Sequence, residues 1–143
     1  MRILIDTNVI LDIIQKREPF FADSYQALCK AIKTDVECLI SASAVTDIFY
    51  MLRKAFQSAQ KAKDRIEQLS QIVTFADVQG VDIHTALIRS MPDFEDAVVD
   101  AVAERNGASY ILTRNIKDFA GSSVPAITPT ELIKHIQSPF PHN

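Results

Sequence analysis

Acidic side chains gather at the start of one predicted helix late in the chain. The stretch MPDFEDAV, residues 91–98, places Asp93, Glu95 and Asp96 within four positions, and Asp100 follows one turn later. In a helix Asp96 and Asp100 share a face, with Asp93 close to the same line. Carboxylates that are collected in a partly dry place repel one another unless a cation neutralises them. The stretch therefore points to a cation site.

More polar side chains follow the apolar runs that predict strands. Asp6 comes directly after the first run, and Asp47 lies about one and a half helical turns beyond the end of the second. Asn115 and Asp118 follow a third run. Because the carboxyl ends of parallel strands meet at one edge of a sheet, where ligands of such folds bind, we expect these side chains to converge with those of the acidic helix.

An acidic cup of oxygen donors suits Mg²⁺ or Mn²⁺. Magnesium prefers oxygen ligands in octahedral geometry and keeps several of its waters. The sequence has no HExxH or CxxC motif, which argues against zinc. A metal of this kind activates water and stabilises charge on a phosphoryl oxygen, so the expected reaction is hydrolysis of a phosphodiester. The candidate metal ligands are Asp6, Asp47, Asp96, Asp100, Asn115 and Asp118.

Short apolar runs alternate with helical patterns, as is typical of an α/β fold. Strands are predicted at 3–5, 37–40, 110–113 and 124–127, and helices at 7–15, 20–33, 43–57, 60–72, 82–90, 95–105 and 130–137. We expect a three-layer α/β/α domain with a central, mainly parallel sheet of four to five strands. A length of 143 residues with 48% hydrophobic content favours a single domain over 1–137, with a flexible tail at 138–143.

Charge and hydropathy restrict the possible partners. A net charge of −3 provides no overall attraction for a polyanion, so a nucleic acid would be held by local basic residues or through a metal ion. No apolar run is long enough to cross a bilayer, and the N-terminus lacks the core of a signal peptide. These features predict a cytoplasmic protein without membrane contact.

Four stretches of the chain form a specific combination: ILIDTN at 3–8, SAVTDIFY at 43–50, DFEDA at 93–97 and YILTRNIKDF at 110–119. This combination resembles the PIN domains, and within them the VapC-like toxin ribonucleases, over nearly the whole chain. It implies a PIN-like domain that acts as a Mg²⁺- or Mn²⁺-dependent endoribonuclease, with Asp6 and Asp96 at the places of two family aspartates. It further implies an RNA substrate and a small antitoxin protein as partner, and it leaves room for a homodimer.

Two positions depart from the commonest family pattern. The second family acid is usually Glu, but here it is Asp47, which is one methylene shorter and is expected to reach a metal through water. The fourth is often Asp, but here it is Asn115, which offers a carbonyl oxygen without charge. Asp100 and Asp118 are available to restore that charge. The expected catalytic residues are Asp6, Asp47, Asp96 and Asn115.

Both departures support an alternative, a catalytically weak or inactive PIN-fold module that binds RNA or a protein partner. A phosphatase of the haloacid dehalogenase type would need an Asp two residues after the nucleophilic one, and Asn8 occupies that place. The acids also have structural alternatives, because Asp is a favoured helix N-cap: Asp6 is placed to cap the first helix, and Asp93 is expected to cap the acidic one.

Substrate contacts are expected from side chains near the proposed site. We prefer Arg114 and Lys117, which follow the third strand, as phosphate contacts. Lys16 and Arg17 are also close to the site by position. Asn8 and Thr113 are further candidates for substrate binding, although their side chains are better suited to tying neighbouring loops together.

Overall fold

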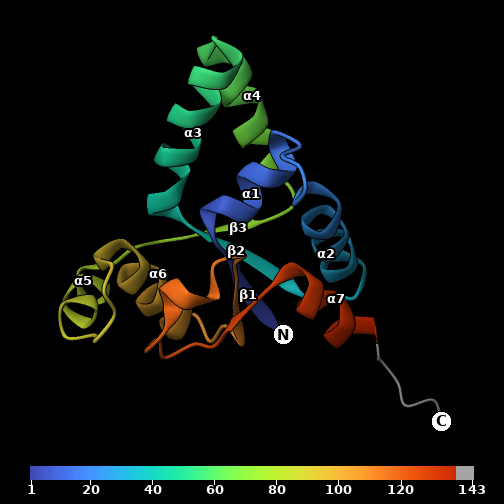
Figure 1. The fold of residues 1–143 in the computed structure, drawn as a ribbon. Helices are drawn as coiled ribbons and strands as arrows, with labels where there is room; N and C mark the ends of the chain where they lie inside the picture. The colour runs from blue at the N-terminus through green and yellow to red at the C-terminus, as the bar shows by residue number, and fades with distance from the viewer. Residues whose placement is uncertain (138–143) are drawn as a thin grey trace.

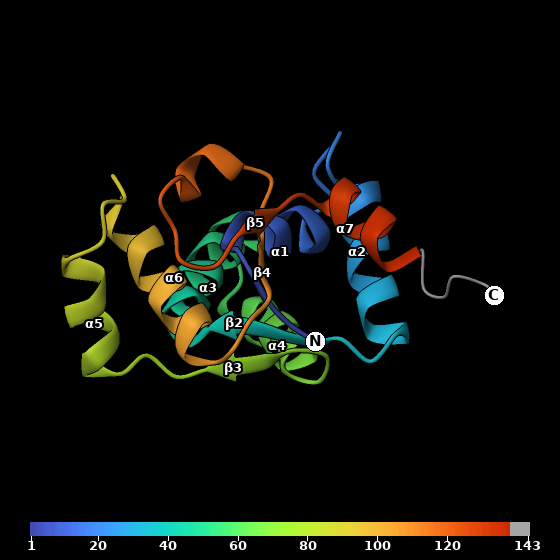
Figure 2. The ribbon, with the colours of Figure 1, turned by 90° about the horizontal axis from the view of Figure 1, so that it is seen from below.

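A five-stranded parallel sheet runs through the centre of the computed structural model, which describes residues 1–137 (Figures 1 and 2). Its strands are β1 (Arg2–Ile5), β2 (Glu37–Ser41), β3 (Thr74–Ala76), β4 (Tyr110–Leu112) and β5 (Ala126–Ile127), in the order β3-β2-β1-β4-β5. The predicted three-layer α/β/α fold is confirmed. Strand β3 was not predicted from the sequence, because its three residues lie at a sheet edge and form no apolar run. The predicted flexible tail at 138–143 lies outside the described residues.

Helices cover both faces of the sheet, and each of the predicted helical patterns corresponds to one of them. The elements are α1 (Thr7–Ile14), α2 (Phe21–Lys33), α3 (Ala42–Phe56), α4 (Ala59–Ser70), α5 (Gly80–Leu87), α6 (Phe94–Arg105), the short 3₁₀ helix η1 (Ile116–Phe119) and α7 (Pro129–Gln137). Alternate strand residues enter separate cores: Ile3 and Ile5 pack with α1 to α4 and α7, whereas Leu4 packs with α5 and α6. Within residues 1–137, no helix is long and apolar enough to cross a membrane.

The strand order places a topological switch point beside β1. The chain continues from β1 to β2 and β3 on one side, and β4 and β5 lie on the other. Ile5 and Leu112 are paired in the register of β1 and β4, and the backbone N–H of Asp6 donates to the carbonyl of Leu112 at 2.9 Å. The segments that follow β1 and β4 therefore begin next to each other, at the place where open α/β sheets bind ligands.

Candidate active site

Asp6 occupies the switch point and is held by three hydrogen bonds. Its Oδ1 accepts from the backbone N–H of Thr7 at 2.9 Å, and its Oδ2 accepts from Thr113 Oγ1 at 2.9 Å and from Asn8 Nδ2 at 3.2 Å. Asp6 thus caps α1, as the structural alternative predicted, while also lining a cavity. Burial raises the pKa of Asp6, and the hydrogen bonds from Thr113 and Thr7 act in the opposite direction. The carboxylate is therefore both desolvated and fixed in orientation.

A cavity of about 820 Å³ opens outside the carboxyl ends of the strands. Its acidic lining side chains are Asp6, Asp47, Glu95, Asp96 and Asp118. They come from the end of β1, the second turn of α3, the first turn of α6 and helix η1. Four segments that are far apart in the sequence therefore bring carboxylates to one place, as the sequence predicted for most of these residues.

Asp96 is the most perturbed of these acids. Its pKa is raised to about 7, first by burial and then by repulsion from Asp6, Asp93, Asp118 and Glu95. No hydrogen bond reaches its carboxylate from the described part of the chain. The helix itself is capped by Asp93, whose side chain accepts from the backbone N–H of Asp96 at 3.0 Å. The expected capping role of Asp93 is confirmed. The Asp96 carboxylate is left available for a cation or for a proton.

The donor chemistry of the cavity fits Mg²⁺ or Mn²⁺. The acidic lining offers only oxygen ligands, and Oδ1 of Asn8 is buried beside Asp6 without a hydrogen-bond partner in residues 1–137. Across the same residues, no three His, Cys, Asp or Glu side chains are gathered tightly enough to hold a metal by themselves. An ion in this cavity would therefore complete its shell with water, which is how magnesium is commonly held.

Asp100 is placed differently from the sequence prediction. Its side chain is fully buried, and its two oxygens accept from the backbone N–H groups of Ser123 and Val124, each at 2.9 Å. Arg89 Nε lies 3.3 Å from its Oδ2. Asp100 does not line the acidic cavity, because the loop before β5 covers its part of α6. This geometry contradicts the metal-ligand role predicted for Asp100.

The residues after β4 also divide differently from the prediction. Asn115 and Lys117 are exposed and do not line the cavity, whereas Asp118 does. The backbone N–H of Asn115 donates to Thr113 Oγ1 at 3.1 Å, which helps to turn the chain into η1. That turn carries Asp118 back to the cavity. The structure therefore favours Asp118 over Asn115 as the fourth oxygen donor, and it gives no support to Lys117 as a substrate contact.

Arg114 is likewise engaged elsewhere. Its Nε donates to Asp12 Oδ2 at 2.7 Å, its Nη2 lies 3.3 Å from Asp12 Oδ1, and its guanidinium stacks 4.1 Å above the ring of Phe20. Asp12 is fully buried. Arg114 therefore balances a buried charge and does not line the acidic cavity, and its predicted role as a phosphate contact stays a prediction. Sequence reasoning missed Asp12, and its signal was a lone charge in the otherwise apolar second half of α1.

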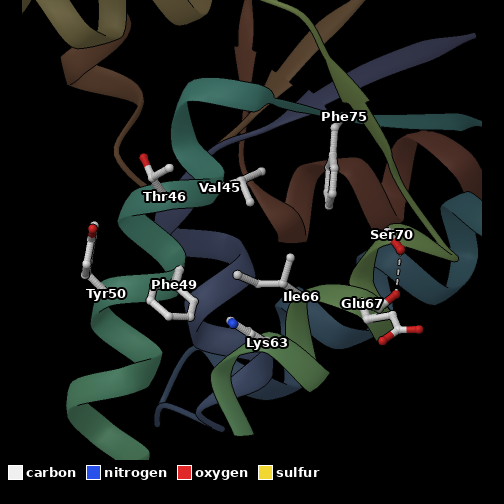
Figure 3. Close-up of a pocket in the computed structure, with 9 residues that line it drawn as sticks. All are labelled: Val45, Thr46, Phe49, Tyr50, Lys63, Ile66, Glu67, Ser70 and Phe75. Atoms are coloured by element: carbon white, nitrogen blue, oxygen red, sulfur yellow. Dashed lines mark hydrogen bonds between the residues drawn. The ribbon is translucent and has the colours of Figure 1, made fainter. Parts of the chain in front are cut away.

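A second hollow, of about 430 Å³, lies between α3, α4 and β3 (Figure 3). Val45, Phe49, Ile66 and Phe75 give it a mainly apolar lining, and Glu67 is the only acidic lining residue among residues 1–137. No pair of carboxylates meets there. Of the two, the acidic cavity is therefore the one whose side chains could carry out a reaction.

Comparison of the sequence and the fold with known proteins identifies the family of this chain. The family model for the PIN domain matches residues 2–117. Ribonuclease VapC1 of Aquifex aeolicus (strain VF5) is 24% identical over an alignment of 135 residues that covers 91% of this chain and 92% of that protein. The solved structure of VapBC2 from Rickettsia felis bound to a promoter DNA fragment has a TM-score of 0.73 at 15% identity, covering 90% of this chain and 98% of that one. A toxin-antitoxin complex from Klebsiella pneumoniae has a TM-score of 0.66 at 21% identity, covering 90% and 98%. Since the matched segment includes β1 to β4 and the acids between them, this chain belongs to the PIN domain family.

Proposed function

We propose that this protein is an endoribonuclease that uses Mg²⁺ or Mn²⁺ to hydrolyse RNA phosphodiester bonds. The observation that carries the proposal is the convergence of Asp6, Asp96 and Asp118 on one cavity at the switch point of the sheet. The name of the relative from Aquifex aeolicus, a ribonuclease, supports the same reaction. Burial and the neighbouring acids raise the pKa of Asp96 to about 7, and perturbed carboxyls in a cavity are typical of functional sites.

The roles of the chain's own residues follow from their contacts. Asp6 would hold the ion, and Thr113 and Asn8 orient its Oδ2 for that purpose. Asp96 would be the second direct ligand, since no donor in the described chain occupies its carboxylate. Asp47 and Asp118 would act through water at the cavity wall. When bound, the ion supplies Lewis acidity for the attack of water on the phosphodiester.

We further propose that the protein is the toxin of a toxin and antitoxin pair. The support comes from the relatives: two of the structures with this fold were solved as VapBC2 and as a toxin-antitoxin complex. An antitoxin would then be a small protein that controls access to the acidic cavity. The competing function is a PIN-fold module that binds RNA or a protein without cutting, and the exposed Asp47 together with the lack of a preassembled metal cage in residues 1–137 favours it.

RNA cleavage separates the two functions. A panel of structured RNAs is incubated with the protein in Mg²⁺, in Mn²⁺ and in chelator. Asp96→Asn keeps the shape of the side chain and removes its charge, and we expect it to lower cleavage by about 100-fold or more. Asp93→Asn is the matched control: it lies on the same helix, outside the cavity lining, and Asn is an equally good N-cap. Cleavage that requires metal and is lost only in Asp96→Asn supports the enzyme. A wild-type protein that binds RNA tightly and cuts none of it would leave only the binding module.

A further inference from the structure

Arg17 is the only basic residue in residues 1–137 that lines the acidic cavity. Its backbone is fixed where α1 ends: its N–H donates to the carbonyl of Asp12 at 3.0 Å, and its own carbonyl accepts from the N–H groups of Phe20 and Phe21 at 3.0 and 2.8 Å. The side chain is 33% exposed. A rigid backbone thus presents a positively charged, partly exposed side chain to a cavity whose other charged lining residues are all acidic.

The acidic neighbour of Arg17 is Asp12, and its carboxylate is already hydrogen-bonded to Arg114. Asp12 forms a close, two-pronged contact with Arg114, at 2.7 and 3.3 Å, whereas Nη1 of Arg17 stays 4.0 Å from Asp12 Oδ1. One buried carboxylate therefore faces two guanidinium groups, and the group of three carries a surplus positive charge. Because Arg114 is the closer partner, that surplus lies on Arg17. No hydrogen bond of the Arg17 side chain is formed within the described part of the chain.

We propose that Arg17 binds a phosphate group of the RNA substrate in the acidic cavity, and that Asp12 and Arg114 position it there. The inference rests on the proposed function and deepens it by assigning the contact that admits a polyanion to an acidic site. The carboxylates of the cavity repel a phosphate, and a guanidinium offers paired N–H donors that match the geometry of phosphate oxygens. Asp12 restrains the Arg17 side chain electrostatically without using its donors.

Binding of a fluorescein-labelled single-stranded RNA tests the assignment. The measurements use the Asp96→Asn background, in which cleavage is prevented, with Mg²⁺ present and over a range of salt concentrations. Arg17→Gln is expected to raise the Kd about tenfold, the loss expected for a charge-assisted hydrogen bond. The slope of log K against log salt should become shallower by about 0.7, since one phosphate contact to a single strand is lost.

Lys16→Gln is the matched control. It removes the same charge one position away, from a side chain that lines a different hollow. We expect Lys16→Gln to leave the Kd and the salt slope unchanged. Arg17→Lys keeps the charge beside Asp12 but loses the fork of donors, so it should retain the salt slope and recover only part of the affinity. In the otherwise wild-type protein, Arg17→Gln should raise KM for RNA cleavage more than it lowers kcat.

Two outcomes overturn the inference in distinguishable ways. If the wild-type protein cleaves RNA but Arg17→Gln and Lys16→Gln shift Kd and salt slope equally, Arg17 acts only through overall charge, and the proposed function stands without it. If the wild-type protein neither cleaves nor binds RNA, the proposed function and the Arg17 contact fail together. Thermal unfolding of Arg17→Gln and Arg17→Lys, expected to match the wild type, separates lost binding from lost folding.

Discussion

The raised pKa of the Asp96 carboxyl predicts that the metal-free protein loses stability as the pH rises. Its pKa is about 7 in the folded chain, against an ordinary value of 3.8. Between these two values the folded chain keeps a proton that the unfolded chain has released, so raising the pH favours unfolding. The stabilising contribution is fully present below the unfolded pKa and is lost as the pH rises through about 7.

The size of this effect follows from the two pKa values. Their difference corresponds to about 4 kcal/mol at roughly 1.36 kcal/mol per pKa unit. Asp96 is only half-buried, so solvent screens its interactions and reduces the expected loss of unfolding free energy to about 1–2 kcal/mol. The same amount should return on addition of Mg²⁺, because a cation that binds only the folded chain removes the repulsion.

Urea unfolding in chelator, at about pH 5 and about pH 8, measures the effect. Asp96→Asn has no titrating group at this position, so its unfolding free energy should change less between the two pH values than that of the wild type. Asp64→Asn, an exposed acid on α4, removes the same charge elsewhere and should keep the wild-type pH dependence. Equal pH dependence in wild type and Asp96→Asn would refute the coupling between this carboxyl and its acidic neighbours.

Four further substitutions test the assignments around the cavity. Asp100→Ala should lower the unfolding free energy measured with urea by about 3 kcal/mol or more, because it leaves Arg89 and the backbone N–H groups of Ser123 and Val124 without their acceptor. Loss of metal-dependent melting at unchanged stability would instead restore Asp100 as a ligand. Thr113→Val should cost about 1–2 kcal/mol in the same assay and weaken Mn²⁺ binding measured by calorimetry, because it removes a donor to the carboxylate at the switch point. Asp118→Asn should lower RNA cleavage about tenfold or more. Asn115→Ala should stay within about twofold of wild type, since its side chain lies outside the cavity.

The sequence predicted the elements that carry a strong local pattern. Strands such as β1 and β2 are continuous apolar runs because both of their faces are covered, and the helices show clear periodicity. Asp6 and Asp96 were predictable for a related reason. Asp6 directly follows a buried strand, and Asp96 lies within the first turn of an acidic helix, so the charge itself signals a site.

Local patterns were uninformative where a side chain's partner is remote in the sequence. Asp96 and Asp100 share a helix face by spacing, and no local pattern reveals that residues 23 and 24 positions later occupy Asp100. Arg114 lies next to the site in sequence, but its partner Asp12 is 102 positions away. Helical and strand periodicity specify which way a residue points along its own element. They do not specify which distant group meets it there.

The hydrogen bond from Thr113 to Asp6 spans 107 positions of the chain, which has a consequence for synthesis. A nascent chain exposes Asp6 and Asp47 early, but Asp96 and Asp118 are added much later, and β4 must still insert beside β1 before Thr113 reaches Asp6. Non-local pairings of this kind form slowly, because the intervening loop must close first. A ribosome that translates this protein therefore carries no complete acidic cavity until the chain has emerged beyond Asp118.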